Sequence, residues 1–275
     1  MFYNDVFKGN KSQFNDKLKI LANLAEEEKW TFAKIEATEP YRILQNYVAF
    51  TYNRIEEEGK FLVNGNNMCF NTGLLTQYHQ EIIALFSKYT GAFDYKWYLI
   101  GFFKSSDSKF TSIFKDIPLI ADYAQDAREL VYDRRLKIVV QKDHIIDDNF
   151  ARFQNAGYSN RALINALLDD AIRTMEMKLI RNYKLALPFY YHNTETGEKK
   201  IQLLAPLYMA GAPVKLAIVL DRRKTGIDEH YEAITIIPVD LAYMNSRVIV
   251  RPEEEWAKIV DEVDVVEIED SEKND

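Results

Sequence analysis

The sequence has few of the residues that stabilise secreted or metal-dependent folds. Its 275 residues include one cysteine, Cys69, and four widely spread histidines. A single cysteine excludes an intramolecular disulfide, and so few thiols and imidazoles argue against a zinc site. We therefore expect no metal ligands and a protein of the reducing cytoplasm.

Long apolar runs are also missing. No stretch approaches the roughly 18 apolar residues that a helix needs to span a bilayer. The opening segment MFYNDVFKGNKS has no basic lead followed by an apolar core, which a secretory signal would have. The sequence thus predicts neither membrane insertion nor export.

Familiar catalytic and cofactor motifs are lacking as well. The chain has no GxGxxG, no HExxH, no CxxC, no GxSxG and no GxxxxGK followed by Ser or Thr. Each of these motifs has a physical reason to exist, such as cradling a phosphate or holding a zinc ion. We therefore expect no cofactor, and any function has to be argued from less specific clusters.

Negative charge is concentrated at one end of the chain. Residues 253–275 contain eleven acidic residues and two lysines, a net charge of −9, while the whole chain carries −7. The rest of the chain therefore carries about +2 and is almost neutral. Charge does not exclude a polyanionic ligand, although no strong basic field favours one.

The composition is that of a packed protein, with 47% hydrophobic residues, 16 Phe and 17 Tyr. Apolar spacing predicts helices over residues 12–30, 40–58, 79–88, 160–184 and 240–247. Apolar runs between turn residues predict strands over residues 60–63, 68–70, 96–104, 136–140, 185–191, 201–208, 214–221 and 231–239. The NGNN turn predicts that the first two strands form a hairpin.

This order is not a regular alternation of strand and helix. It predicts an α+β fold with a mixed or mainly antiparallel sheet and with N-terminal and central helices. No linker rich in Pro, Gly or Ser separates two regions. We therefore expect a single domain over residues 1–256, followed by an acidic tail at 257–275, where VDEVDVVEIE alternates enough to add an edge strand.

The first polar cluster is the segment FNTGL, which contains Asn71, Thr72 and Gly73. A turn of this composition at a strand end exposes backbone N–H groups and lets a phosphate or ribose approach closely. The alternative interpretation is an ordinary turn in which the Asn side chain bonds to its own backbone.

The second cluster surrounds the strand at 136–140. Asp133 and Arg135 precede it, and Asp143, His144, Asn149 and Arg152 follow it. An Asp–His pair could form a general base, and arginines offer the planar fork that phosphates favour. Alternatively, His144 bonds to a backbone carbonyl at a strand end, and the arginines pair with Asp133 and Asp147.

The third cluster lies near the C-terminus, where Tyr243, Asn245 and Arg247 fall within two turns of the expected helix. Tyr and Asn beside Arg suit a base stacked on an aromatic ring with its phosphate clamped. A capped helix with an ion pair is the alternative interpretation.

At these residues the sequence resembles a bacterial and phage family catalogued as domain of unknown function 3825. The resemblance covers roughly residues 30–256. It rests on PYRILQNYVAFTYNRIEEEGK, CFNTGLLT, WYLIGFFKSSD, LVYDRRLKI, KDHIIDDNFARF, IQLLAPLY and ITIIPVDLAYMNSRVIVRPEEEW. Some members join this domain to cold-shock or LOTUS-type modules, so the resemblance implies a connection with RNA by association and implies no catalytic residue.

Three functions follow as hypotheses. The first is a binding module for RNA or a phosphate-bearing nucleotide, in which the Asn, Thr and Arg residues of the three clusters form a polar groove. The second is an enzyme acting on a nucleotide or phosphodiester, with His144 as general base oriented by Asp143 or Asp147. The third is a protein-interaction module that uses the many tyrosines and the acidic tail.

Overall fold

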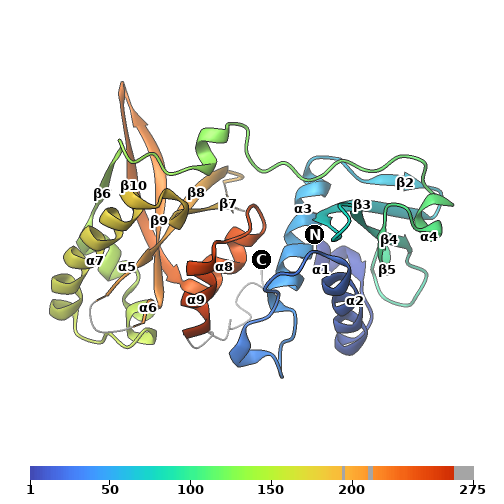
Figure 1. The fold of residues 1–275 in the computed structure, drawn as a ribbon, viewed down its shortest axis with the longest axis horizontal. Coiled ribbons are helices and arrows are strands. Elements are labelled where there is room, and N and C mark those ends of the chain that lie inside the picture. The colour runs from blue at the N-terminus through green and yellow to red at the C-terminus, as the bar shows by residue number, and fades with distance from the viewer. Residues whose placement is uncertain (194–195, 210–212, 263–275) are drawn as a thin grey trace. The chain divides into compact units, whose positions relative to one another are not determined.

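The computed structural model describes residues 1–193, 196–209 and 213–262, and the chain divides into two compact units, residues 1–123 and 124–275. Each unit contains its own five-stranded sheet (Figure 1). The α+β class and the mixed sheets are confirmed, whereas the contacts define two units where the sequence suggested one continuous core. The junction after Tyr123 lies in the segment IADYAQDA, whose composition does not mark a linker. No described helix is long and apolar enough to cross a membrane.

In the first unit the sheet has the strand order β1-β5-β4-β3-β2. The short edge strand β1 runs parallel to β5, and the other neighbours are antiparallel. Helices α2 and α3 pack against β5 and β3 (Figure 1). The elements are α1 (Phe2–Asp5), β1 (Val6–Phe7), α2 (Lys11–Leu24), η1 (Ala33–Ile35), α3 (Arg42–Glu57), β2 (Leu62–Asn64), β3 (Asn67–Leu75), β4 (Glu81–Lys88), β5 (Trp97–Lys104) and α4 (Ser108–Thr111).

Local sequence explains where these elements begin and end. Asn10 caps α2, and it forms a reciprocal capping box with Gln13. Helix α3 ends before Gly59, whose φ of 64° is readily adopted only by glycine. In the predicted hairpin, Asn64 pairs with Asn67 and Gly65 has a φ of 57°, as a tight two-residue turn requires.

The helix expected over residues 79–88 is wrong, because this segment forms strand β4. Strand β4 lies in the middle of the sheet between β3 and β5. Its residues from Ile82 to Phe86 are all buried, since a central strand is covered on both faces. A continuous apolar run of this length has no periodicity that separates a buried strand from a helix.

The core of the first unit includes its only cysteine. Cys69 is fully buried and packs with Ile83, Leu85, Phe110 and Phe114. Burial raises the pKa of the Cys69 thiol to about 12, so that the thiol is protonated and unreactive in the folded protein.

In the second unit the sheet has the strand order β6-β10-β9-β8-β7, with β6 parallel to β10 and the other neighbours antiparallel (Figure 1). Helices α5 and α6 pack on β10, α7 packs on β8, and α8 packs on β7. The elements are η2 (Ala127–Leu130), β6 (Lys137–Val140), α5 (Lys142–Asp148), α6 (Phe150–Asn155), α7 (Arg161–Arg181), η3 (Tyr183–Leu185), β7 (Leu187–His192), β8 (Lys199–Leu207), β9 (Leu216–Thr225), β10 (Asp228–Pro238), α8 (Val239–Arg247) and α9 (Glu254–Glu262).

The segment expected to begin an acidic tail at residue 257 instead continues a helix. Helix α9 buries Trp256, Ile259 and Val260, and the Trp256 indole donates to the Leu185 carbonyl at 2.9 Å. Three apolar residues at helical spacing explain why this stretch folds despite its acidic neighbours. The edge strand expected in VDEVDVVEIE falls mostly on residues 263–275, outside the described residues.

Candidate functional site

In the sheet of the second unit, the neighbouring strands β8 and β9 separate along part of their length. Strand β8 pairs with β9 only from Leu203, opposite Leu220, to Leu207. Before Leu203, β8 stays paired with β7, and beyond Leu220, β9 stays paired with β10. The two strands thus separate while each keeps one neighbour, and the backbone groups that would continue their ladder lack each other as partners.

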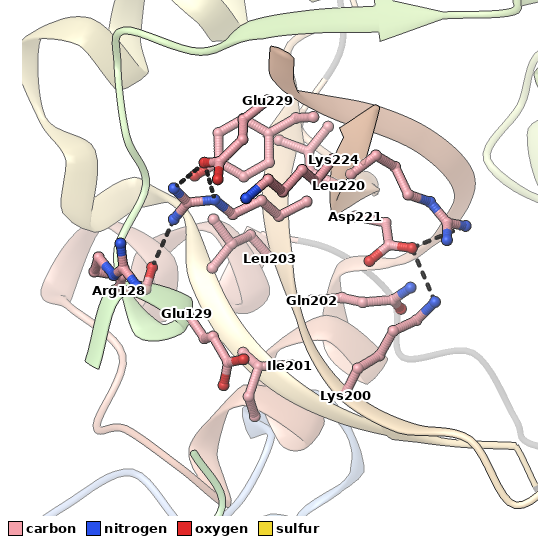
Figure 2. Close-up of a pocket in the computed structure, with 13 residues that line it drawn as sticks. Arg128, Glu129, Lys200, Ile201, Gln202, Leu203, Leu220, Asp221, Lys224 and Glu229 are labelled. Atoms are coloured by element: carbon pink, nitrogen blue, oxygen red, sulfur yellow. Dashed lines mark hydrogen bonds and ion pairs between the residues drawn. The ribbon is translucent and has the colours of Figure 1, made fainter. Parts of the chain in front are cut away.

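A cavity of about 240 Å³ lies at this opening (Figure 2). Consecutive residues of both strands line it, although consecutive side chains point to opposite faces of a sheet. Such a lining is expected for a cavity between two strands rather than above one face. The lining residues are Arg128, Glu129, Lys200, Ile201, Gln202, Leu203, Leu220, Asp221, Arg222, Arg223, Lys224, Glu229 and Tyr231.

Five of these residues are cationic and three are acidic. Arg222 bonds to Glu229 through Nε at 3.2 Å and Nη2 at 2.6 Å, and its Nη1 donates to the Arg128 carbonyl at 3.4 Å. The bond from Arg222 lowers the pKa of Glu229, which therefore stays ionised at neutral pH. The Arg222 fork is held in place by these contacts.

A buried carboxylate organises another part of the cavity. Asp221 is 2% exposed and accepts from Lys200 Nζ at 2.9 Å, and it forms an ion pair with Arg223 at 3.0 Å. Burial lowers the pKa of Lys200, but its bonds to Asp221 and Glu198 outweigh this effect and raise the pKa overall. Two cations are therefore held beside one buried anion.

Two lining residues differ from the rest because the fold leaves their polar groups unused. Gln202 as a whole residue is 4% exposed, and its side chain forms no hydrogen bond within the described part of the chain. Figure 2 shows it between Asp221 and Lys200. Lys224 has no carboxylate within ion-pair distance among the described residues. The Gln202 amide is therefore available to a ligand in the cavity.

The residues of FNTGL lie in the first unit, within strand β3, where the ladder with β4 is irregular between Asn71 and Leu75. Asn71 donates to Glu81 and to the Pro118 carbonyl, and accepts from the Gly73 N–H at 3.0 Å. Thr72 donates to the Ile82 carbonyl at 2.7 Å. Asn71 and Thr72 are each 1% exposed. These bonds form a turn that closes on itself, and ligand binding by these residues stays a prediction.

Asp133 and Arg135 form an ion pair with each other in the second unit. Arg135 bonds to both carboxylate oxygens, at 2.8 and 2.6 Å, and its side chain is 84% exposed. The bond from Arg135 lowers the pKa of Asp133 to about 2. The Asp133 N–H donates at 2.9 Å to the hydroxyl of Tyr231, which lines the cavity, so this pair lies beside the cavity.

Asp143 and His144 lie on helix α5 rather than at a strand end, and both are exposed. Asp147, expected to orient the imidazole, instead pairs with Arg161. No hydrogen bond or ion pair of His144 occurs among the residues that the structure describes. The structure thus does not bring together the carboxylate and imidazole that a general base would need.

Asn149 and Arg152 join helix α6 to strand β10. The Asn149 Oδ1 accepts from Arg152 at 2.7 Å and from the Thr235 hydroxyl at 2.6 Å, and Arg152 also donates to the Ile236 carbonyl at 2.7 Å. Burial lowers the pKa of Arg152, which still remains charged at neutral pH. These contacts engage both side chains within the unit.

Tyr243, Asn245 and Arg247 lie on α8, where Tyr243 and Arg247 are buried and Asn245 is half-buried. None of the residues predicted for binding or catalysis lines the cavity. No motif in the sequence marks the lining of this cavity, because Gln202 lies inside the apolar run IQLL and several of the cations lie in DRRK at a strand end. A polar residue in an otherwise apolar strand is the signal that was available.

Comparisons with known proteins give one match. The model of a family described as "Domain of unknown function (DUF3825)" matches residues 21–256 and so spans both units and every residue of the cavity. No curated protein and no solved structure matches the chain significantly.

Proposed function

We propose that this chain, which belongs to the DUF3825 family, is a binding module for a phosphate-bearing ligand, a nucleotide or the end of an RNA, and that the cavity of the second unit holds the phosphate and its sugar. The observation that carries the proposal is Gln202, whose side-chain amide lines the cavity beside five cations and forms no hydrogen bond to a described residue. An amide can both donate to and accept from a ribose or base edge, and so complements groups next to a phosphate.

The cations of the cavity suit a phosphate better than an uncharged ligand. Arg222 presents a fixed planar fork, and Lys224, which lies opposite Glu229 in the β9–β10 ladder, adds a further positive charge. An arginine fork gives bidentate bonds to phosphate oxygens, whereas an ammonium acts as a point charge.

The size of the cavity limits the ligand. Its volume of about 240 Å³ lies below the roughly 300–1,000 Å³ typical of pockets for drug-sized ligands. One nucleotide-sized group fits a cavity of this volume, and a duplex does not. With so few phosphate contacts, affinity should fall only gently with added salt.

What favours a binding module over an enzyme is the absence of a paired base at the cavity. Among the described lining residues there is no histidine, and the carboxylates Asp221 and Glu229 are held by cations. An ionised carboxylate in an ion pair is a weak base at neutral pH. Turnover of any nucleotide by the purified protein would favour the enzymatic alternative.

The test is titration calorimetry with AMP and with a short RNA bearing either a 5′-phosphate or a 5′-hydroxyl. Arg222→Lys keeps the charge but removes the fork, and we expect it to weaken AMP binding by about 1–3 kcal/mol. Arg173→Lys, at an exposed position of α7, is the matched control and should bind like the wild type. Binding weaker than millimolar for all three ligands, or an unchanged affinity of Arg222→Lys, would overturn the proposal.

A further inference from the structure

Five aromatic rings form a cluster at the edge of the first unit, where β1 pairs with β5. Phe7 lies at the centre, with ring centroids 5.0 Å from Tyr89, 5.5 Å from Tyr95 and 6.0 Å from Tyr98. Phe93 stacks on Phe7 at 6.3 Å. The cluster therefore joins strand β1, strand β5 and the loop that precedes β5.

This aromatic cluster is not part of the buried core. Phe93 is 65% exposed and Tyr98 is 36% exposed, while Phe7, Tyr89 and Tyr95 are half-buried. Aromatic side chains usually supply core contacts, and a group of them on the surface marks an interaction site. The rings contact one another at several angles, so that some of their faces and edges meet solvent.

Lysines lie beside the aromatic cluster. Lys17 Nζ lies 4.5 Å from the centroid of the Tyr98 ring and donates to the Leu99 carbonyl at 2.7 Å. Residues 5–11 and 88–98, which carry the five rings, contain four lysines and two aspartates. The charge around the rings is therefore positive.

We propose that the aromatic cluster is a stacking platform for the bases of single-stranded nucleic acid, with the phosphate backbone passing the lysines. Every base has a π face, so stacking on exposed Phe and Tyr rings is possible without a particular sequence. Lysines beside the rings supply the charge that a phosphate backbone needs. Bases in a duplex are already stacked and cannot use such a platform, which therefore selects unpaired strands.

This site is separate from the cavity in its residues and does not rest on the proposed function. Both proposed ligands are nucleotides or nucleic acids. The aromatic cluster recognises the bases, whereas the cavity binds a terminal phosphate. An apolar protein partner is the competing occupant of an aromatic surface. The positive charge beside the rings favours the nucleic acid.

The experiment uses the full chain and fluorescence anisotropy of a labelled twelve-residue oligouridylate, compared with a duplex of similar length. Phe93→Leu keeps an apolar side chain but removes the π face. Because Phe93 is exposed, we expect this change to leave the fold intact. We expect Phe93→Leu to weaken oligouridylate binding about tenfold, and Phe93→Leu with Tyr98→Leu to weaken it further. Tyr78→Leu is the control, since Tyr78 is 82% exposed and lies outside the cluster.

The outcomes separate this proposal from the one for the cavity. We expect the two ring variants to bind AMP like the wild type and Arg222→Lys to keep its oligouridylate affinity. Equal binding of oligouridylate by the wild type and the ring variants would overturn the platform, as would tighter binding of the duplex. Loss of AMP binding alone in Arg222→Lys would leave the platform unaffected.

Discussion

Two buried residues with side-chain amides, one in each unit, differ in their hydrogen bonding. Asn71 is 1% exposed and takes part in three hydrogen bonds, whereas Gln202 is 4% exposed and takes part in none among the described residues. Both lie on strands at a place where the ladder is interrupted. Burial of a polar group therefore does not identify a binding residue, and the decisive property is whether the fold already satisfies it.

The two interruptions explain this difference. In β3 the chain makes a local bulge, where Gly73 has a φ of 75° and Tyr47 donates to the Thr72 carbonyl at 2.7 Å. A bulge of this kind inserts residues while the neighbouring strand stays in place, so nearby groups can close around it. Between β8 and β9 the strands themselves separate, and no described residue fills the space beside Gln202.

The largest effect is expected for Asn71→Ala. The change leaves the Pro118 carbonyl and the Gly73 N–H without their partners, and each unsatisfied buried group costs about 1–3 kcal/mol. We expect the free energy of unfolding to fall by about 3 kcal/mol in urea denaturation. Asn66→Ala, in the exposed turn before β3, should change it by less than about 0.5 kcal/mol. Equal values for both variants would contradict the assignment of Asn71 to the fold.

A smaller effect of opposite sign is expected for Gln202→Leu. The Gln202 amide forms no hydrogen bond to a described residue that the change would remove, and leucine has a similar volume. We expect the free energy of unfolding to stay the same or to rise by up to about 1 kcal/mol, while AMP binding weakens. A loss of stability comparable to that of Asn71→Ala would mean that Gln202 is a structural residue, and the contrast between the two amides would disappear.

The smallest effect on stability is expected at the exposed ion pair of Asp133 and Arg135. The folded pKa of Asp133 is about 2, below its value near 3.9 in the unfolded chain. The pair therefore contributes to the free energy of unfolding above about pH 4, and this contribution is lost as the pH falls from about 4 to about 2. Arg135→Gln should raise the pKa of Asp133 in an NMR titration and leave the denaturation midpoint at pH 7 unchanged, because exposed pairs contribute little. A clear midpoint shift would show that the pair holds neighbouring elements together.

Sequence patterns predicted the elements whose signals are local. Helix α3 ends before Gly59, Gly65 lies in the first hairpin turn, and α7 follows a long apolar stripe. Strand β4 was missed because a central strand is apolar on both faces and has no period of two. The cavity was missed because it depends on where β8 stops pairing with β9, at Leu203 and Leu220. That register is a tertiary property, and no pattern within either strand encodes it.

The buried thiol of Cys69 makes the stability of one unit measurable inside the intact chain. A thiol-specific alkylating reagent attacks the thiolate, so Cys69 can react only when the first unit opens and exposes it. Since the chain has no other cysteine, the labelling rate at low denaturant reports the opening equilibrium of residues 1–123 alone. Tryptophan fluorescence of Trp256, buried in the second unit, contributes to the signal that follows the rest of the chain. Comparing the two transitions shows whether the units unfold together or one at a time.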